Sequence, residues 1–157
     1  MDGDGLKDLI IGAAPGTSPY VSIFDTGTLA LKKRFLAYDA AFLGGINVSA
    51  GDLKGDSVEE IAVGSNSAEA HVTVWSAKSG ELLNSFYAYG QNDGGPAFKG
   101  GVRVGLVAYA QQEVDVLVTG AGPSSFPHAR VWSFSVPTYV ESFYVAPVDD
   151  TRGVKVG

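Results

Sequence analysis

The chain contains an internal repeat, which limits its fold more than any other feature of the sequence. An aromatic residue recurs at Phe24, Trp75 and Trp132, spaced by 51 and 57 residues, and a second aromatic follows each of them after 11 residues. A repeat of this length indicates an array of similar units, each of which buries its apolar surface against its neighbours. The 157 residues divide into three approximate copies of this unit: 1–45, 46–101 and 102–157.

Within each copy, apolar residues recur every second residue, which is the period of a β-strand and not of a helix. Short continuous apolar runs, each followed by glycine directly or one residue later, also predict strands that are buried on both faces. These runs lie at 9–11, 61–63 and 116–118. In the middle copy we expect four strands at about 46–51, 60–65, 71–76 and 81–89.

Four short strands in a copy of about 50 residues are typical of one blade of a β-propeller. We therefore predict an all-β fold of three such four-stranded blades. The recurring aromatics Phe24, Trp75 and Trp132 are interpreted as packing between blades. His71 and His128 share one repeat position with Tyr20, so we expect packed, hydrogen-bonded strand residues there and not catalytic bases.

Charge and composition exclude several classes of function. The chain carries 17 acidic and 11 basic residues, a net charge of −6, which argues against a nucleic-acid partner. No apolar stretch approaches the roughly 20 residues of a membrane span, so no membrane insertion is expected. The chain has no cysteine, which excludes disulfides and thiolate chemistry.

Carboxylates gather in a hairpin turn before the buried strand of the first two copies. They are Asp2, Asp4 and Asp8 in the first copy and Asp52, Asp56 and Glu60 in the middle copy. Carboxylates at alternate positions around a glycine turn form an oxygen cage that suits calcium, with its six to eight oxygen ligands, better than magnesium. The same turn can instead hold its shape through side-chain hydrogen bonds to its own backbone, without an ion.

The chain resembles the FG-GAP (VCBS-type) repeat family, which forms the blades of integrin α-chain-like propellers and of many secreted bacterial repeat proteins. The resemblance spans all three copies. It rests on three segments: Phe42-Leu43-Gly44-Gly45, Gly12-Ala13-Ala14-Pro15 and Gly120-Ala121-Gly122-Pro123. The family's calcium loop has the pattern Asp-x-Asp/Asn-x-Asp-Gly-x-x-Asp, with carboxylate ligands at positions 1, 3, 5 and 9 and a carbonyl ligand at position 7.

The resemblance implies two ligand sets. These are Asp52, Asp56, Glu60 and the carbonyl of Val58 in the middle copy, and Asp2, Asp4, Asp8 and the carbonyl of Leu6 in the first. The middle loop departs from the family pattern at Lys54, a cation that can substitute for the metal, and at Ser57, which replaces glycine. The first position of the first loop would precede Met1. The third copy has no ligand set, since its aligned residues are Ala108, Ala110, Gln112 and Val116.

The function that the resemblance implies is a non-catalytic, calcium-stabilised interaction module of the adhesion or surface-binding type. Its partner would be an unknown protein or glycan, and its location extracellular or at the cell surface. Two alternatives stay open. One is a part of a propeller enzyme or lectin whose active centre needs further blades, and the other is a structural spacer.

The phase of the repeat bears on assembly. The chain starts inside an acidic hairpin and ends in the first strand of a blade, while propellers usually have four to eight blades. We therefore expect either a larger propeller or self-association, most simply a homodimer that completes a six-bladed ring. In that dimer, Val154 and Val156 of one chain would pair beside 9–11 of the other.

Overall fold

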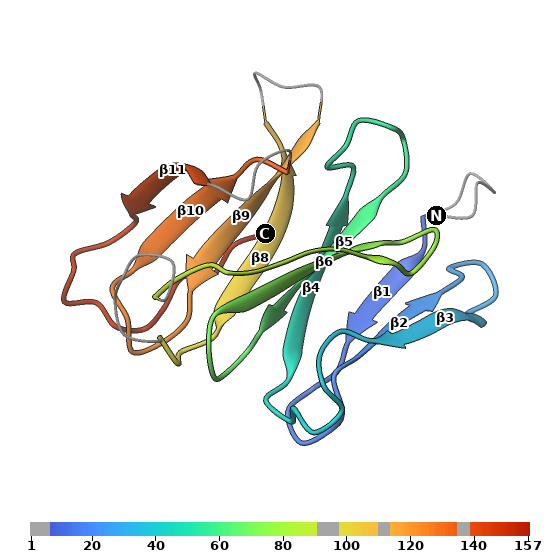
Figure 1. The fold of residues 1–157 in the computed structure, drawn as a ribbon, viewed down its shortest axis with the longest axis horizontal. Helices are drawn as coiled ribbons and strands as arrows, with labels where there is room; N and C mark the ends of the chain where they lie inside the picture. The colour runs from blue at the N-terminus through green and yellow to red at the C-terminus, as the bar shows by residue number, and fades with distance from the viewer. Residues whose placement is uncertain (1–6, 91–97, 110–113, 135–138) are drawn as a thin grey trace.

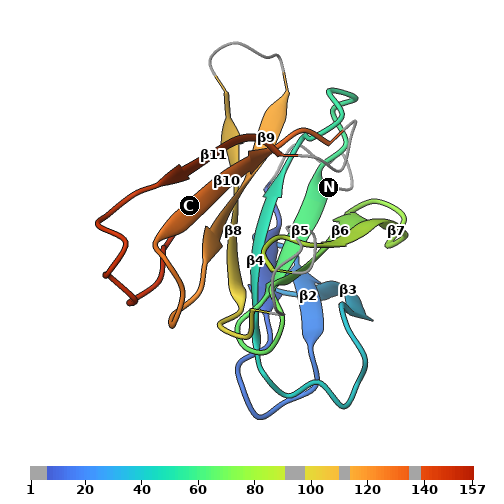
Figure 2. The same cartoon turned by 60° about the vertical axis from the view of Figure 1, so that its left-hand side comes forward.

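The structure is a computed structural model, and it describes residues 7–90, 98–109, 114–134 and 139–157. Within these residues every regular element is a β-strand. The strands form three separate antiparallel sheets, arranged side by side with the sheet of residues 46–87 between the other two (Figures 1 and 2). The expected all-β class is thus confirmed. No helix of the length and hydrophobicity that a membrane crossing needs is found in the described part of the chain.

Each sheet is formed by strands that are consecutive in the chain and pair with their sequence neighbours. Sheet 1 contains β1 (Leu9–Gly12), β2 (Tyr20–Phe24) and β3 (Leu31–Leu36). Sheet 2 contains β4 (Ile46–Gly51), β5 (Glu60–Ser65), β6 (His71–Ser76) and β7 (Leu82–Tyr87). Sheet 3 contains β8 (Val102–Ala108), β9 (Asp115–Ala121), β10 (His128–Trp132) and β11 (Tyr139–Tyr144). The strands expected in the middle copy match sheet 2, with the last one shorter at both ends.

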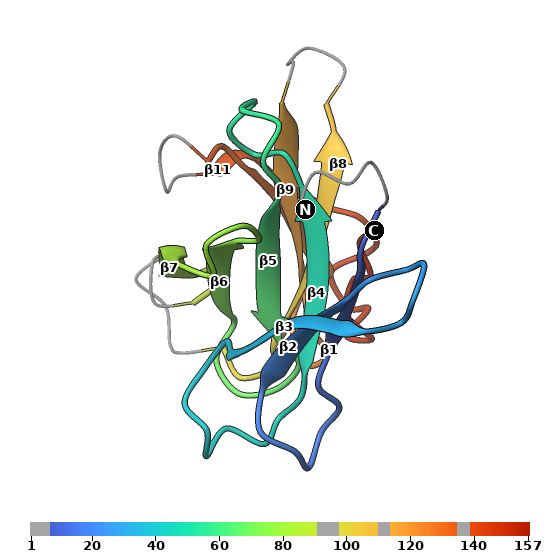
Figure 3. The ribbon, with the colours of Figure 1, turned by 90° about the vertical axis from the view of Figure 1, so that its right-hand side faces the viewer.

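The register shows which residues of the three sheets are equivalent. Ile61 pairs with Trp75 in sheet 2, Leu9 with Phe24 in sheet 1, and Leu117 with Trp132 in sheet 3. In each sheet, an apolar residue of β1, β5 or β9 therefore lies beside the recurring aromatic of the next strand. Figure 3 shows β4 and β8 near the middle of the molecule, with β7 and β11 towards its periphery.

Sheet 1 packs on sheet 2, and sheet 2 packs on sheet 3, so the core has two parts. The first part includes Val21 and Ile23 of sheet 1 against Ile61 and Val63 of sheet 2. The second part unites Val72 and Val74 of sheet 2 with apolar residues of sheet 3: Val102, Val104, Leu117, Ala121 and Trp132. Burial of this apolar surface is the main favourable contribution to holding the sheets together.

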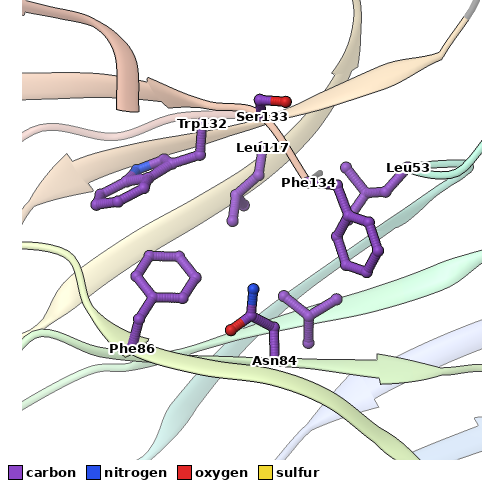
Figure 4. A pocket seen from close by; sticks show the side chains of 8 residues that line it. Leu53, Asn84, Phe86, Leu117, Trp132, Ser133 and Phe134 are labelled. Carbon is purple, nitrogen blue, oxygen red and sulfur yellow. The ribbon is translucent and has the colours of Figure 1, made fainter. Parts of the chain in front are cut away.

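An aromatic pair bridges each contact between sheets at the same repeat position. The ring centroids of Phe35 and Trp75 lie 4.9 Å apart between sheets 1 and 2, and those of Phe86 and Trp132 lie 4.5 Å apart between sheets 2 and 3. Figure 4 shows Phe86 and Trp132 facing each other beside Leu117, around a cavity of only about 10 Å³. The prediction that Trp75 and Trp132 pack between repeats is confirmed. Phe24, at the equivalent position, lies on the outer face of sheet 1.

The prediction that the run 9–11 is buried on both faces is wrong. Leu9 and Ile11 are 43% and 47% exposed, whereas the equivalent Ile61 and Val63 are fully buried. The difference arises because sheet 1 covers that face of sheet 2, while no described sheet covers the same face of sheet 1. The run 61–63, in contrast, is buried throughout, as predicted.

Asn47 of β4 joins sheet 2 to sheet 3 by polar contacts. Its Nδ2 donates to the carbonyl of Val102 at 2.7 Å and to that of Gly64 at 3.0 Å, and its Oδ1 accepts from the backbone N–H of Val104 at 2.8 Å. The side chain therefore satisfies backbone groups of β5 in sheet 2 and of β8 in sheet 3.

Residues 153–157 follow sheet 3 and contact it in the same way as the start of sheet 2 contacts sheet 1. The N–H of Val154 donates to the carbonyl of Ala121 at 2.8 Å, as the N–H of Ile46 donates to that of Ala13 at 3.0 Å. Ile46 opens β4, the first strand of the next sheet. The first blade strand that we expect at the end of the chain is not a regular strand in the structure, but residues 153–156 begin at the position that a further strand would take.

Candidate functional site

The middle acidic hairpin, residues 52–60, connects β4 to β5 and is held together by its own side chains. The Asp52 carboxylate accepts hydrogen bonds from the backbone N–H of Gly55 at 2.7 Å and of Ser57 at 2.8 Å. Asp56 accepts from the N–H of Val58 at 2.9 Å. Ser57, at the glycine position of the family motif, has φ of 61°, in the left-handed region. The turn thus closes by the side-chain-to-backbone bonds that were the alternative to an ion.

Lys54 supplies the positive charge of this hairpin. Its Nζ lies 3.0 Å from Oε1 of Glu60 and 3.4 Å from Oδ2 of Asp56. Glu60 is buried, and its other oxygen accepts the N–H of Leu53 at 3.0 Å. Burial raises the pKa of the Glu60 carboxyl above its usual value, while Lys54 acts in the opposite direction. The hydrogen bond with Glu60 raises the pKa of the Lys54 ammonium, so this lysine is charged at neutral pH.

The middle hairpin does not fit a calcium ion as it is arranged. Two of its expected carboxylate ligands, Asp56 and Glu60, bind the Lys54 ammonium, and the third, Asp52, binds backbone amides. In the described ranges, no group of three or more histidine, aspartate or glutamate side chains could hold a metal ion.

Most of the first acidic hairpin lies outside the described residues. This applies to Asp2, Asp4 and Leu6, whereas Asp8 is described. The Asp8 side chain is 1% exposed, and its Oδ1 lies 2.7 Å from Nζ of Lys32 on β3. Lys32 also lies 3.1 Å from Oδ2 of Asp25. Asp8 is the repeat equivalent of Glu60, so each of these carboxylates has a lysine partner, from its own hairpin in one case and from β3 in the other.

In the third copy, the position equivalent to Glu60 is Val116, which is buried. Ala110 and Gln112, two of the other aligned residues, lie outside the described residues, so the absence of a ligand set in this copy stays a prediction. The neighbouring Asp115 has a different contact. Its Oδ2 accepts the N–H of Asp52 at 2.9 Å, so it supports the middle hairpin from sheet 3.

A groove between sheets 1 and 2 is the second candidate site, and sequence reasoning missed it. It has a volume of about 660 Å³ and is lined by Tyr38, Phe42, His71, Trp75, Tyr87 and smaller side chains. The rings of Tyr38, His71 and Tyr87 form a continuous row, with centroid separations of 5.1 and 4.8 Å. An aromatic-lined groove with a few polar groups is the usual form of a small-ligand site.

Both histidines, His71 beside the groove and its repeat equivalent His128, have structural partners. His71 Nε2 lies 2.8 Å from the Ser85 hydroxyl, and His128 Nε2 lies 2.5 Å from the Ser142 hydroxyl. Burial lowers the pKa of His71 below its usual value, so its ring is neutral at physiological pH. The expectation of packed, hydrogen-bonded strand residues is confirmed for both.

Tyr38 lines the groove, and its hydroxyl is hydrogen-bonded to the backbone of sheet 2. Its hydroxyl donates to the carbonyls of Val63 at 2.9 Å and His71 at 2.7 Å, as Tyr89 donates to those of Thr119 and His128. Burial raises the pKa of the Tyr38 phenol well above its usual value, so it stays protonated and remains a donor. The sequence signal that could have indicated the groove is the alignment of Tyr38 with Tyr89, three residues after the recurring Phe35 and Phe86.

Comparison of the chain with protein-family models finds no match. Comparison with curated proteins finds none either. The resemblance to FG-GAP repeats therefore rests on the residues quoted for it and on nothing further.

Proposed function

We propose that the chain is a non-catalytic interaction module built from β-propeller-type blades, with each sheet as one blade. A single observation carries the proposal. One mode of docking between sheets is used twice within the chain, and among the described residues the outer faces of sheets 1 and 3 keep large apolar side chains exposed at equivalent positions. The module would act by binding a further sheet of the same kind, most simply that of a second copy.

The outer face of sheet 1 supports this assembly. It carries Leu9, Ile11 and Leu31 with exposures of 43%, 47% and 53%. The first two are equivalent to Ile61 and Val63, which sheet 1 buries completely. Repeat positions that are buried in sheet 2 are thus apolar and accessible in sheet 1, and such patches commonly mark protein interaction sites.

The outer face of sheet 3 offers the complementary half. Phe143 of β11 is equivalent to Phe35 and Phe86, each of which contacts the tryptophan of the following sheet, and it is 45% exposed. Phe24 takes the place of that tryptophan on sheet 1. In a dimer, Phe143 of one chain would pack on Phe24 of the other. Residues 153–157 would add a first strand to the three strands of sheet 1, and two such contacts would close a ring of six sheets.

The acidic hairpins have a structural role in this proposal, which is to fix the turn that leads into each buried strand. In the middle hairpin, Lys54 takes the part of the cation. Calcium binding by Asp2, Asp4, Asp8 and the carbonyl of Leu6 stays a prediction, because three of these four residues lie outside the described part. An extracellular or cell-surface location, and a foreign protein or glycan partner, also stay predictions.

The oligomeric state tests the proposal. Multi-angle light scattering over a range of concentrations should give twice the mass of the chain, with dissociation on dilution. Leu9→Lys and Phe143→Lys each place a charge in the proposed contact and should shift the mass to that of a monomer. Leu43→Lys is the matched control, since Leu43 is an exposed leucine of the loop between sheets 1 and 2.

A concentration-independent monomer with a cooperative melt would contradict the proposal. A dimer that survives both Leu9→Lys and Phe143→Lys would place the contact on another surface and would equally overturn it.

A further inference from the structure

The space between sheets 2 and 3 is filled by a side chain, whereas the equivalent space between sheets 1 and 2 is the open groove. Between sheets 2 and 3, the Arg130 side chain fills this space and is 4% exposed. The guanidinium carbon lies 5.0 Å from the ring centroid of Tyr89 and 4.4 Å from that of Tyr139. Nη1 donates to the carbonyl of Ala88 at 2.6 Å. A guanidinium is therefore a built-in occupant of this site, held by aromatic faces and a backbone carbonyl.

Between sheets 1 and 2, the residue equivalent to Arg130 is Thr73, which is too short to fill the same space. The other parts of the site are retained. Tyr38 takes the place of Tyr89, and its hydroxyl bonds to the carbonyls of two equivalent residues. Ala37 takes the place of Ala88. The Ala37 N–H donates to the carbonyl of Pro19, just as the Ala88 N–H donates to that of the equivalent Ala70. Leu82 replaces Tyr139, so one of the two aromatic walls becomes aliphatic. The open groove is thus the Arg130 site without its arginine.

Charge also distinguishes the two spaces. Asp39 and Glu69 line the open groove, whereas the equivalent positions beside the filled one are Gly90 and Phe126. Among the described residues that line the open groove, Lys99 is the only positively charged one. The site that lacks an internal cation is therefore the one that carries the extra carboxylates, and the aromatic row from Tyr38 to Tyr87 offers ring faces beside them.

We propose that the groove between sheets 1 and 2 binds a guanidinium group, in particular the arginine side chain of a partner protein. The guanidinium would stack on Tyr38, donate to the carbonyl of Ala37 and face Glu69 and Asp39. This inference rests on the proposed function, because it names the ligand chemistry of the interaction module. It does not involve the end faces, so binding in the groove and assembly can fail independently.

The test is a titration of the full chain, labelled with ¹⁵N, with Nα-acetyl-arginine amide to tens of millimolar. The two tryptophans report on the two spaces. The indole N–H of Trp75, in the open groove, should shift and saturate, while that of Trp132, beside Arg130, should not. The neutral isostere Nα-acetyl-citrulline amide should bind at least about tenfold more weakly, because it lacks the cation–π and carboxylate attractions. Equal shifts with both compounds, or no shift with either, would overturn the inference.

Thr73→Arg places the arginine within the chain and should abolish the shift at Trp75 on adding the arginine amide. A Thr73→Arg variant that still binds it in the groove would contradict the inference. Since this variant can also fail to fold, Glu69→Gln provides a milder test and should weaken binding severalfold. Glu141→Gln removes the same charge from sheet 3 and should leave binding unchanged.

A simple methyl glycoside is a further arm of the titration. A shift at Trp75 with the glycoside and none with the arginine amide would assign the groove to glycans and reject the guanidinium. Light scattering of the same samples reports on assembly separately. A monomer that binds the arginine amide would refute the proposed ring while supporting the groove.

Discussion

Asp52 and Asp115 join sheets 2 and 3 through two reciprocal hydrogen bonds. The N–H of Asp115 donates to the carbonyl of Asp52 at 2.9 Å, and the N–H of Asp52 donates to Oδ2 of Asp115 at 2.9 Å. Gly51 lies so close that an added Cβ would clash with the Asp115 carboxylate. The middle acidic hairpin is thereby fixed at both ends, by Lys54 within it and by Asp115 from the neighbouring sheet.

Asp115→Ala should lower the free energy of unfolding by about 1–3 kcal/mol, because it leaves the part-buried N–H of Asp52 without its charged acceptor. Urea denaturation measures the change. Asp149→Ala is the control, since Asp149 is exposed in the turn after β11, and its effect should stay within about 0.5 kcal/mol. Equal effects of the two substitutions would argue against a contribution of the Asp52–Asp115 pair.

Lys54→Met should destabilise the chain in a pH-dependent way. Without the ammonium, the pKa of the buried Glu60 rises further above its value in the unfolded chain. Below the unfolded pKa the carboxyl is protonated in both states, and the variant should differ little from the parent chain. As the pH rises through the raised pKa, the unpaired charge should cost about 1–3 kcal/mol of stability.

Urea denaturation at a series of pH values between 4 and 8 measures the free energy of unfolding and checks this prediction. Adding Glu60→Gln to Lys54→Met should remove the extra pH dependence, because the group that titrates is then gone. A stability loss that is constant with pH would show that Lys54 acts through packing and not through its charge.

Lys54→Asn should convert the middle hairpin into a calcium site. The substitution removes the competing cation and supplies an oxygen at the third position of the family motif. With a Kd on the order of 10⁻⁴ to 10⁻³ M, 10 mM calcium would add about 1.4–2.7 kcal/mol of stability. Melting curves in EGTA and in calcium measure it, relative to any response of the parent chain. Lys78→Asn replaces an exposed lysine in the turn between β6 and β7 of the same sheet and should gain nothing.

Tyr38→Phe and Tyr89→Phe remove equivalent hydroxyls from the two contacts between sheets. Each loses a donor that serves two carbonyls, which should cost about 0.5–1.5 kcal/mol or more where the site is dry. Tyr89 is only 5% exposed, beside Arg130, whereas Tyr38 borders the open groove. We therefore expect the larger loss for Tyr89→Phe, and a larger loss for Tyr38→Phe would contradict this account of the two spaces.

The repeat in the sequence was enough to predict the strands of sheet 2 and the packing of Trp75 and Trp132. These features follow from local alternation and from the spacing of large apolar residues, which each copy carries in itself. The role of Lys54 was also accessible, because it stands within the hairpin where the family motif has an oxygen ligand.

Features that depend on the register of the strands or on the packing between sheets could not be predicted in the same way. The pairing of Asp8 with Lys32 needs the register of three strands, and the exposure of Leu9 depends on which face of sheet 1 a neighbour covers. The open groove depends on the difference between Thr73 and Arg130 at one position, whose effect is visible only once the docking of the sheets is known.

The inter-sheet contacts of Asn47 have a consequence for production of the chain in a secretory host. Asn47-Val48-Ser49 fits the acceptor pattern for N-linked glycosylation, in which the sugar is attached to Nδ2. In the folded chain that nitrogen already donates to the carbonyls of Gly64 and Val102, and the Ser49 hydroxyl accepts the N–H of Leu106 at 2.9 Å. A sugar on Asn47 would occupy the place where sheet 3 meets sheet 2. Glycosylation at this residue should therefore oppose the docking of sheet 3 on sheet 2, and a chain modified before it folds should be less stable than the unmodified one.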